Sequence, residues 1–219
     1  MINLVKKDLK LSTKINVFAF IYAISIAAMG IPLSSHPAVN ILYALAIIML
    51  VFVSVIYTNG YDDRYKSEIV LNSFPIDRRD IVRGKYLILI IFILTSCILI
   101  FLFTNIINVI YFHENRSGAN IFDIIFAINV LLIFYSIYYP FYFKLGEGLR
   151  TFNVVMWVLV FVGPSILKKV GNALVEKEFF IKIASLDLNK ISLCFLIFGV
   201  VVYYISLQLS KIIYMNREF

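Results

Sequence analysis

The sequence has little of what enzymes and metal proteins use for chemistry. Only 15% of its 219 residues are charged, and it contains two cysteines and two histidines. Cys97 and Cys194 lie far apart without CxxC spacing, which argues against a disulfide or cysteine metal site and favours packing roles. His36 and His113 are equally isolated. We therefore expect no metal centre.

Motifs for catalysis are also missing. Gly84 and Lys85 do not form a phosphate loop, because they lack both the upstream glycine and the following Ser or Thr of GxxxxGK[ST]. The chain has no HExxH motif, and the interiors of its apolar segments hold no acidic residue that would support ion-coupled transport. We expect no catalytic residue and no cofactor in this chain.

What the chain has instead is long apolar segments, with 62% hydrophobic residues against a little under half in soluble domains. A helix needs about 20 apolar residues to cross roughly 30 Å of hydrocarbon. Six segments have about this length: 15–33, 38–58, 86–112, 122–143, 149–167 and 191–210. The sequence predicts an all-α integral membrane protein, a six-helix transmembrane bundle forming one domain over 1–219.

Lys and Arg residues are distributed unevenly between the two sides of such a bundle. With six spans both termini share a side, and that side collects 14 of the 20 basic residues. Basic residues in short loops resist translocation, so we expect both termini in the cytoplasm. The net charge of +7 reflects this asymmetry and contact with anionic membrane lipid, and it gives no reason to expect nucleic-acid binding.

Two segments outside the spans each have two interpretations. Residues 1–14 alternate apolar residues with lysines, which is typical of a helix lying on the membrane surface, although an ordinary basic flank has the same composition. The outer loop 168–190 keeps apolar stretches that can form re-entrant helices where protein buries them. The alternative for this loop is a surface segment with an amphipathic turn.

The connection at 59–85 carries the densest charge. It has six basic and five acidic residues between Asp62 and Lys85, too balanced a mixture for a polybasic lipid-binding patch, which indicates a protein partner. Apolar spacing predicts a short amphipathic helix in its first half, ended by Pro75. Asp77 then suits the N-cap of a second helix that continues from Arg78 through Lys85 into the third span.

Aromatic residues crowd the inner end of the fourth span around Pro140. They indicate either an interfacial aromatic belt with a proline kink or the lining of a path for an amphipathic substrate. The second interpretation assigns this path to Tyr135, Tyr138, Tyr139 and Tyr142. Asn105, Asn108 and Asn129 inside the third and fourth spans favour hydrogen bonds between helices over substrate contacts.

The residues of this connection also resemble a known family. An acidic residue (Glu68), a short hydrophobic helix (Ile69 to Leu71), an SFP corner (Ser73 to Pro75) and a basic entry to the third span (Arg78 to Lys85) resemble the permease subunits of ABC-2 type transporters in low-GC Gram-positive bacteria. Within the family, the resemblance is to permeases that export phenol-soluble modulins, which are short amphipathic peptides. The six-span topology resembles the family along the whole chain.

This resemblance implies a bacterial cell-membrane protein whose loop helix after the second span is a coupling helix on a separate cytoplasmic ABC ATPase, which binds ATP and Mg. The implied ATPase contacts are Arg64, Tyr65, Glu68, Ile69, Leu71, Phe74, Pro75, Asp77, Arg78, Arg79 and Asp80. The resemblance also implies that 165–190 forms outer re-entrant helices. Since ATPase dimers are two-fold symmetric, we expect a second permease chain, identical or paralogous.

Together these observations predict a non-catalytic permease that couples ATP hydrolysis by its partner to export of amphipathic peptides or lipid-like substrates. The alternative is a peptide-binding membrane immunity or sensor protein without ATP-driven transport.

Overall fold

The computed structural model describes residues 2–30, 38–74, 76–110, 118–146 and 188–217, and within these ranges every regular element is an α-helix. The helices are α1 (Ile2–Leu11), α2 (Thr13–Gly30), α3 (Ala38–Arg64), α4 (Ser67–Ser73), α5 (Arg78–Ile110), α6 (Ile121–Leu145) and α9 (Leu188–Met215). The all-α prediction is therefore confirmed for the described part of the chain.

Four of these helices, α3, α5, α6 and α9, are each long and apolar enough to cross a membrane. The α1–α2 pair, bent by 60°, makes a fifth candidate if the two helices form one span. The predicted span at 149–167 lies outside the described residues, as does all but the last part of the predicted outer loop 168–190. The count of six spans and the re-entrant helices therefore stay predictions.

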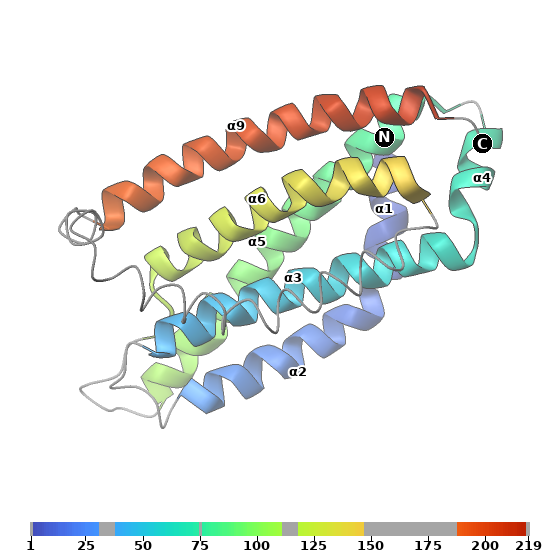
Figure 1. Cartoon of the computed structure of the whole chain (residues 1–219). Helices are drawn as coiled ribbons and strands as arrows, with labels where there is room; N and C mark the ends of the chain where they lie inside the picture. The colour runs from blue at the N-terminus through green and yellow to red at the C-terminus, as the bar shows by residue number, and fades with distance from the viewer. Residues whose placement is uncertain (1, 31–37, 75, 111–117, 147–187, 218–219) are drawn as a thin grey trace.

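The long helices lie side by side with their axes roughly aligned (Figure 1). Helix α5 contacts α1, α2, α3 and α9, while α6 packs along α9 and α3. The core between them is apolar, with fully buried Ile47 on α3, Leu89 on α5 and Leu131 on α6. Many outward-facing side chains, such as Phe18 and Phe198, are also apolar. Apolar residues on both the inner and outer sides are typical of a bundle surrounded by lipid.

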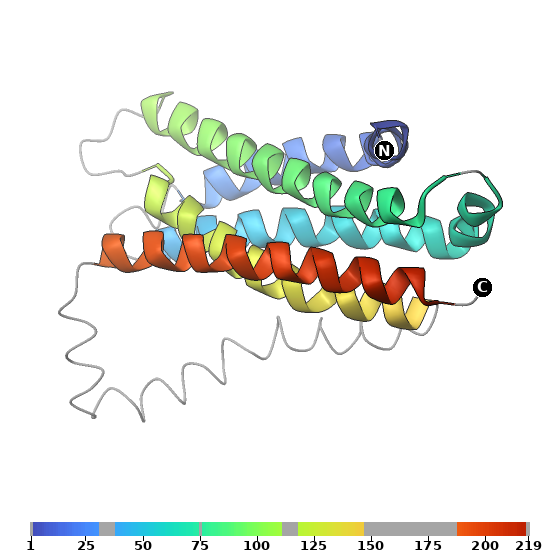
Figure 2. The same ribbon diagram turned by 90° about the horizontal axis from the view of Figure 1, so that it is seen from above.

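One end of the bundle gathers helix α1, the end of α3, α4, the start of α5 and the end of α9 (Figures 1 and 2). We call this the charged end. Helix α3 runs to Arg64, beyond the predicted span end at 58, and α5 begins at Arg78, before the predicted span start at 86. Residues 59–64 and 78–85 are less hydrophobic than the spans, but both are helical, and they place Asp62 and Lys85 in buried positions.

The chain turns sharply on either side of α4. Lys66, between α3 and α4, has a left-handed backbone (φ 48°, ψ 41°), which is uncommon for a residue other than glycine. After α4, the Arg79 N–H donates to Asp77 Oδ1 at 2.9 Å, so the predicted N-cap is confirmed. Helix α5 then continues for 33 residues, as predicted for a lever joined to the third span. Pro75 lies outside the described residues.

Candidate functional site

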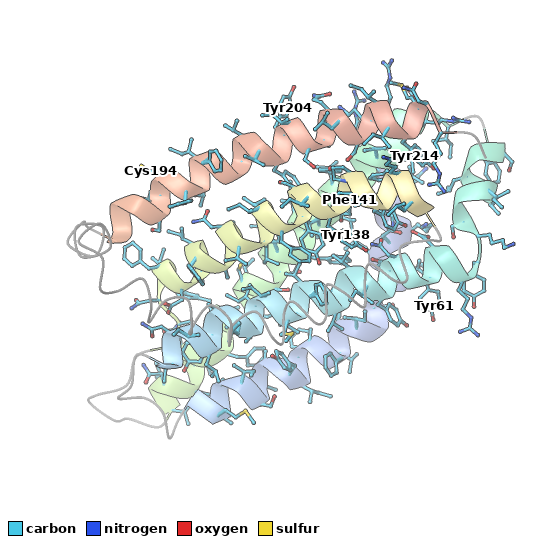
Figure 3. The ribbon with its side chains drawn as sticks, in the orientation of Figure 1. Tyr61, Tyr138, Phe141, Cys194, Tyr204 and Tyr214 are labelled. Atoms are coloured by element: carbon cyan, nitrogen blue, oxygen red, sulfur yellow. The ribbon has the colours of Figure 1, made fainter. Side chains whose placement is uncertain are left out.

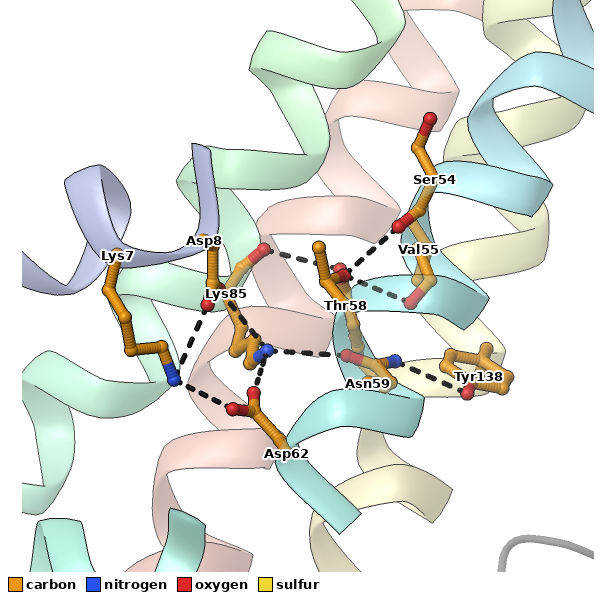
Figure 4. A network of polar contacts seen from close by, with 10 residues as sticks. Lys7, Asp8, Ser54, Val55, Thr58, Asn59, Asp62, Lys85 and Tyr138 are labelled. Atoms are coloured by element: carbon orange, nitrogen blue, oxygen red, sulfur yellow. Dashed lines mark hydrogen bonds and ion pairs between the residues drawn. The ribbon is translucent and has the colours of Figure 1, made fainter. Parts of the chain in front are cut away.

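Four charged side chains meet at the charged end, and we call them the charge ring: Lys7, Asp8, Asp62 and Lys85 (Figure 4). Lys7 Nζ lies 2.7 Å from Asp62 Oδ1 and 3.4 Å from Asp8 Oδ1. Lys85 Nζ lies 2.5 Å from Asp62 Oδ2 and 3.2 Å from Asp8 Oδ2. Each lysine thus contacts both aspartates, and the ring carries no net charge.

Burial makes this pairing energetically important. Asp8, Asp62 and Lys85 are only 3%, 4% and 8% exposed. Removing charges from water costs several kcal/mol per ion, which is offset only when partners and hydrogen bonds satisfy them. Asn59 helps, because Lys85 Nζ donates to its Oδ1 at 3.3 Å while its Nδ2 donates to Tyr138 Oη at 3.4 Å. The ring is therefore a charge-paired polar cluster inside an apolar bundle, in which Asp8 Oδ1 has an ion-pair contact with Lys7 but accepts no hydrogen bond from the described residues.

The position of the ring along the chain gives it mechanical importance. Asp62 lies near the end of α3 and Lys85 near the start of α5. Their ion pair therefore joins the two ends of the connection that contains α4. Lys7 and Asp8 attach α1 to the same point. A force on α4 would therefore reach α1, α3 and α5 together.

Sequence reasoning missed this ring: it rejected Gly84 and Lys85 as a phosphate loop and placed them in the basic helical entry to the third span, without a buried partner for Lys85. Lys85 shares a face of α5 with buried Ile81, Val82 and Leu89, three and four residues away, and this spacing was the available signal. Gly84 lies where α5 meets α1: a methyl group placed there would make an ordinary van der Waals contact with Leu4 Cβ, at 3.4 Å.

A second polar network joins α5 to α6 and α9 next to the ring. Tyr86 Oη lies 2.7 Å from the hydroxyls of both Ser206 and Ser210. Tyr203 Oη donates to the Tyr86 carbonyl at 2.8 Å, and Tyr139 Oη donates to the Lys85 carbonyl at 3.2 Å. The charge ring is thus continuous with hydrogen bonds that reach the α6–α9 pair.

The four tyrosines predicted to line a substrate path all lie on α6 and are buried inside this single chain. Tyr135, Tyr138, Tyr139 and Tyr142 are each no more than 2% exposed. Their rings pack against one another, and Tyr139 also packs on Tyr86 of α5. A substrate could reach them only if α6 separated from its neighbours, so the path stays a prediction.

The polar asparagines differ in their roles. Asn129 Nδ2 donates to the Ser192 carbonyl of α9 at 2.9 Å, which confirms the predicted hydrogen bond between helices. Asn105 Nδ2 instead donates to the Phe101 carbonyl of its own helix at 2.8 Å. Polar side chains in membrane helices commonly make both kinds of bond.

Pro140 leaves one carbonyl of α6 without its helical hydrogen-bond donor, and α9 supplies a replacement donor. Proline has no N–H, so the Ser136 carbonyl four residues earlier loses its helical donor. Ser206 Oγ donates to that carbonyl at 2.6 Å. We expect Ser206→Ala to lower the free energy of unfolding by about 1–3 kcal/mol, the cost of an unsatisfied buried acceptor. Denaturation in mixed detergent and SDS measures this change.

The partner variant Pro140→Ala makes the prediction specific, because it restores the missing N–H. Ser206→Ala should cost clearly less in the Pro140→Ala background than in the natural chain. Ser210→Ala is the matched control. Ser210 lies on α9 like Ser206 and also bonds Tyr86, yet the loss of stability in Ser210→Ala should not depend on the residue at position 140. Equal Ser206→Ala costs in both backgrounds would contradict this account.

The predicted ATPase contacts divide into two groups. The first is exposed: more than half of the surface of Tyr65, Ile69 and Phe74 is open, and so is that of their neighbour Val70. We call these four residues the α4 patch. Arg64 and Arg79 are exposed as well. The side chains of Glu68 and Pro75 lie outside the described part.

The second group builds the corner itself. Leu71 is half-buried against the core. Arg78 Nη1 donates to the carbonyls of Met215 and Arg217 at 3.2 and 3.0 Å, where its positive charge suits the C-terminal end of α9. Asp80 pairs with Arg83 at 3.2 Å, and Asp77 caps α5. These residues fix the geometry in which the α4 patch is presented.

Comparisons with known proteins place these features in a family. A family model described as "ABC-2 family transporter protein" matches residues 3–215, which include every helix from α1 to the end of α9 except the first residue of α1. No curated protein and no solved structure matches the chain. Among the described residues, no group of three or more His, Cys, Asp or Glu is arranged to hold a metal ion.

Proposed function

The chain belongs to the ABC-2 family of transporter proteins, and we propose that it is a non-catalytic permease subunit of an ABC exporter that docks a separate cytoplasmic ATPase through α4. The family implies association with ABC ATPase subunits. ATP and Mg would be bound by that partner and not by this chain.

The observation that carries the proposal is the α4 patch. Ile69 and Val70 are exposed on α4 itself, and Tyr65 and Phe74 are exposed just before and just after this helix, with charged Arg64 and Lys66 next to Tyr65 in the chain. Exposed apolar clusters rimmed by polar residues mark interaction surfaces. Aromatic side chains such as Tyr65 and Phe74 are also enriched where proteins meet. The patch therefore fits a groove on a cytoplasmic protein.

The charge ring supplies the mechanical link from this patch to the membrane. Closure of two ATPase subunits would move α4, and the ion pairs of Asp62 with Lys85 and Lys7 would transmit that motion to α5 and α1. Helix α5 is one continuous rod, so its displacement extends into the bundle. A symmetric ATPase dimer calls for a second permease chain, identical or paralogous.

The substrate and the orientation of the chain are proposed from its sequence. The sequence resemblance supports an amphipathic peptide of the phenol-soluble modulin kind, or a lipid-like molecule, as the exported substrate. The same resemblance supports a location in a bacterial cell membrane. The concentration of basic residues supports an orientation with the charged end and both termini in the cytoplasm.

A double substitution in the α4 patch tests the proposal. Ile69→Asp with Phe74→Asp places two carboxylates in the apolar interface and should reduce recovery of an ATPase with the tagged chain, purified from its native membranes, by at least about tenfold, because each buried unpaired charge costs several kcal/mol. The measurement is quantitative mass spectrometry of the co-purified chains.

Ile121→Asp is the matched control, because Ile121 is equally exposed but lies at the opposite end of the bundle. It should leave ATPase recovery unchanged. Recovery of no phosphate-loop ATPase with the natural chain would instead favour a peptide-binding immunity or sensor protein. Undiminished recovery with the double variant would remove α4 as the docking element.

A further inference from the structure

Three cations line the outer seam between α5 and α9 at the charged end, and we call them the cationic seam: Arg79, Arg83 and Lys211. Arg79 Nε lies 3.2 Å from Met215 Sδ, which brings the two helices together. Because α5 starts at this end and α9 finishes there, Arg83 comes level with Lys211, one turn farther into the bundle (Figure 1). Lys211 lies within electrostatic reach of both arginines.

The charges of this seam are only partly balanced. Arg83 Nη1 pairs with Asp80 Oδ1 at 3.2 Å, and Lys211 Nζ donates to the neutral Gln208 Oε1 at 3.3 Å. Among the described residues, the ion pair with Asp80 is the one salt bridge that these three cations form. Arg79 and Arg83 are exposed, so the seam opens outward. Gathering like charges costs free energy, which an external anion would relieve.

Below the cations the same seam becomes apolar. Helical spacing places exposed Leu87, Ile90 and Leu94 on the α5 flank that begins at Arg79 and Arg83. On α9, half-buried Leu207 and exposed Tyr204 precede Lys211 by four and seven residues, so helical spacing places them on the flank that carries Lys211. Figure 3 shows Tyr204 pointing outward from α9. The two helices are closest at the charged end and diverge away from it (Figure 2). The cationic seam therefore continues into an apolar strip, and the two meet at the expected level of the membrane surface.

We propose that the cationic seam binds the phosphate headgroup of an anionic phospholipid, with the acyl chains along the apolar strip below it. Arginine forms paired hydrogen bonds to phosphate oxygens, and Lys211 adds a point charge. Basic sites between membrane helices on the cytoplasmic side bind such headgroups. The site contains none of the four residues of the α4 patch and does not depend on the exporter assignment, although Arg79 also belongs to the predicted ATPase contacts.

Native mass spectrometry of the full chain in mild detergent, with equal phosphatidylglycerol and phosphatidylcholine, tests this site. Wild-type protein should retain phosphatidylglycerol preferentially. Arg83→Gln with Lys211→Gln should reduce that preference at least about fivefold, since each basic side chain near an anionic surface contributes about 1 kcal/mol. The matched control Lys6→Gln with Lys10→Gln removes the same charge from exposed lysines of α1 and should keep the preference within about twofold.

Equal loss in both double variants would show diffuse attraction, and no loss in the seam variant would show that the cations do not select lipid; either result overturns the proposal. Excess inorganic phosphate should not displace the bound phosphatidylglycerol. Displacement would indicate a site for free anions and overturn the lipid assignment. If the double variant fails to fold, the single Lys211→Gln variant should still lose at least half of the preference for phosphatidylglycerol. An unchanged preference in that variant would also overturn the proposal.

Discussion

Replacing Lys85 by Met should lower the free energy of unfolding by about 3–5 kcal/mol, the cost of leaving buried charges without a partner. The change removes the cation that contacts both Asp8 and Asp62 and leaves a single lysine for two buried carboxylates. Met matches the length of the lysine stem, so apolar packing is largely kept. Unfolding of the purified chain in mixed detergent and SDS measures the loss.

Restoring charge balance should rescue this variant. Asp62→Asn alone leaves an excess of positive charge, but combined with Lys85→Met it leaves the neutral Lys7–Asp8 pair. The double variant should recover at least half of the stability lost in Lys85→Met. Lys6→Met is the matched control: it removes an exposed lysine beside the ring and should change stability by less than about 0.5 kcal/mol. Additive losses in the double variant would show that the four charges do not act as one cluster.

Replacing Tyr139 by Ala should cost about 3–5 kcal/mol of unfolding free energy, because it removes a large ring from a packed core. Tyr139 is 1% exposed and contacts the rings of Tyr86, Tyr135 and Phe143. Tyr139→Phe keeps the ring and loses only the hydrogen bond to the Lys85 carbonyl, so about 1 kcal/mol is expected. SDS unfolding again provides the comparison.

The pair of variants also separates packing from a role in the substrate path. If Tyr139 lined an open path, Tyr139→Ala would leave stability nearly unchanged while altering transport. A large stability loss for Ala with a small one for Phe identifies the residue as part of the resting core. The same comparison at Ile137, an exposed residue on α6, supplies the control, since Ile137→Ala should have little effect on stability.

Local chemistry explains why some of this structure was predictable from the sequence. Asp77 precedes the first helical residue after a corner, and its cap forms within two residues. The stretch from Arg78 into the third span contains no proline, so its continuity as α5 could be expected. The long apolar segments could also be predicted to be helices, because each has about the length that a helix needs to cross a membrane.

The charge ring could not be predicted in the same way. Lys7 and Asp62 are 55 positions apart, and Asp62 and Lys85 are 23 apart, so their pairing depends on how α1, α3 and α5 pack. Hydropathy alone places the ends of the predicted apolar spans at 58 and 86, so it gives no sign that Asp62 and Lys85 beyond those ends lie buried against each other. A charge that finds a buried partner does not end a helix.

The α6 tyrosines show a different limit. Spacing of three and four residues from Tyr135 to Tyr142 places their side chains on one helix face. Spacing cannot tell whether that face meets a helix of the same chain, a second permease or a cavity. The structure shows that α6 packs against α3, α5 and α9, and that Ser206 of α9 donates to the carbonyl freed by Pro140.

Cross-linking from the α4 patch tests the central claim, that α4 contacts an ATPase, most directly. A photoreactive phenylalanine analogue placed at Phe74 should, on illumination of intact cells, form a covalent adduct with a chain that carries a phosphate-loop ATPase motif. The same analogue at Ile121, at the opposite end of the bundle, should form none. Adducts at Phe74 that contain only lipid, or only proteins without an ATPase motif, would contradict the account.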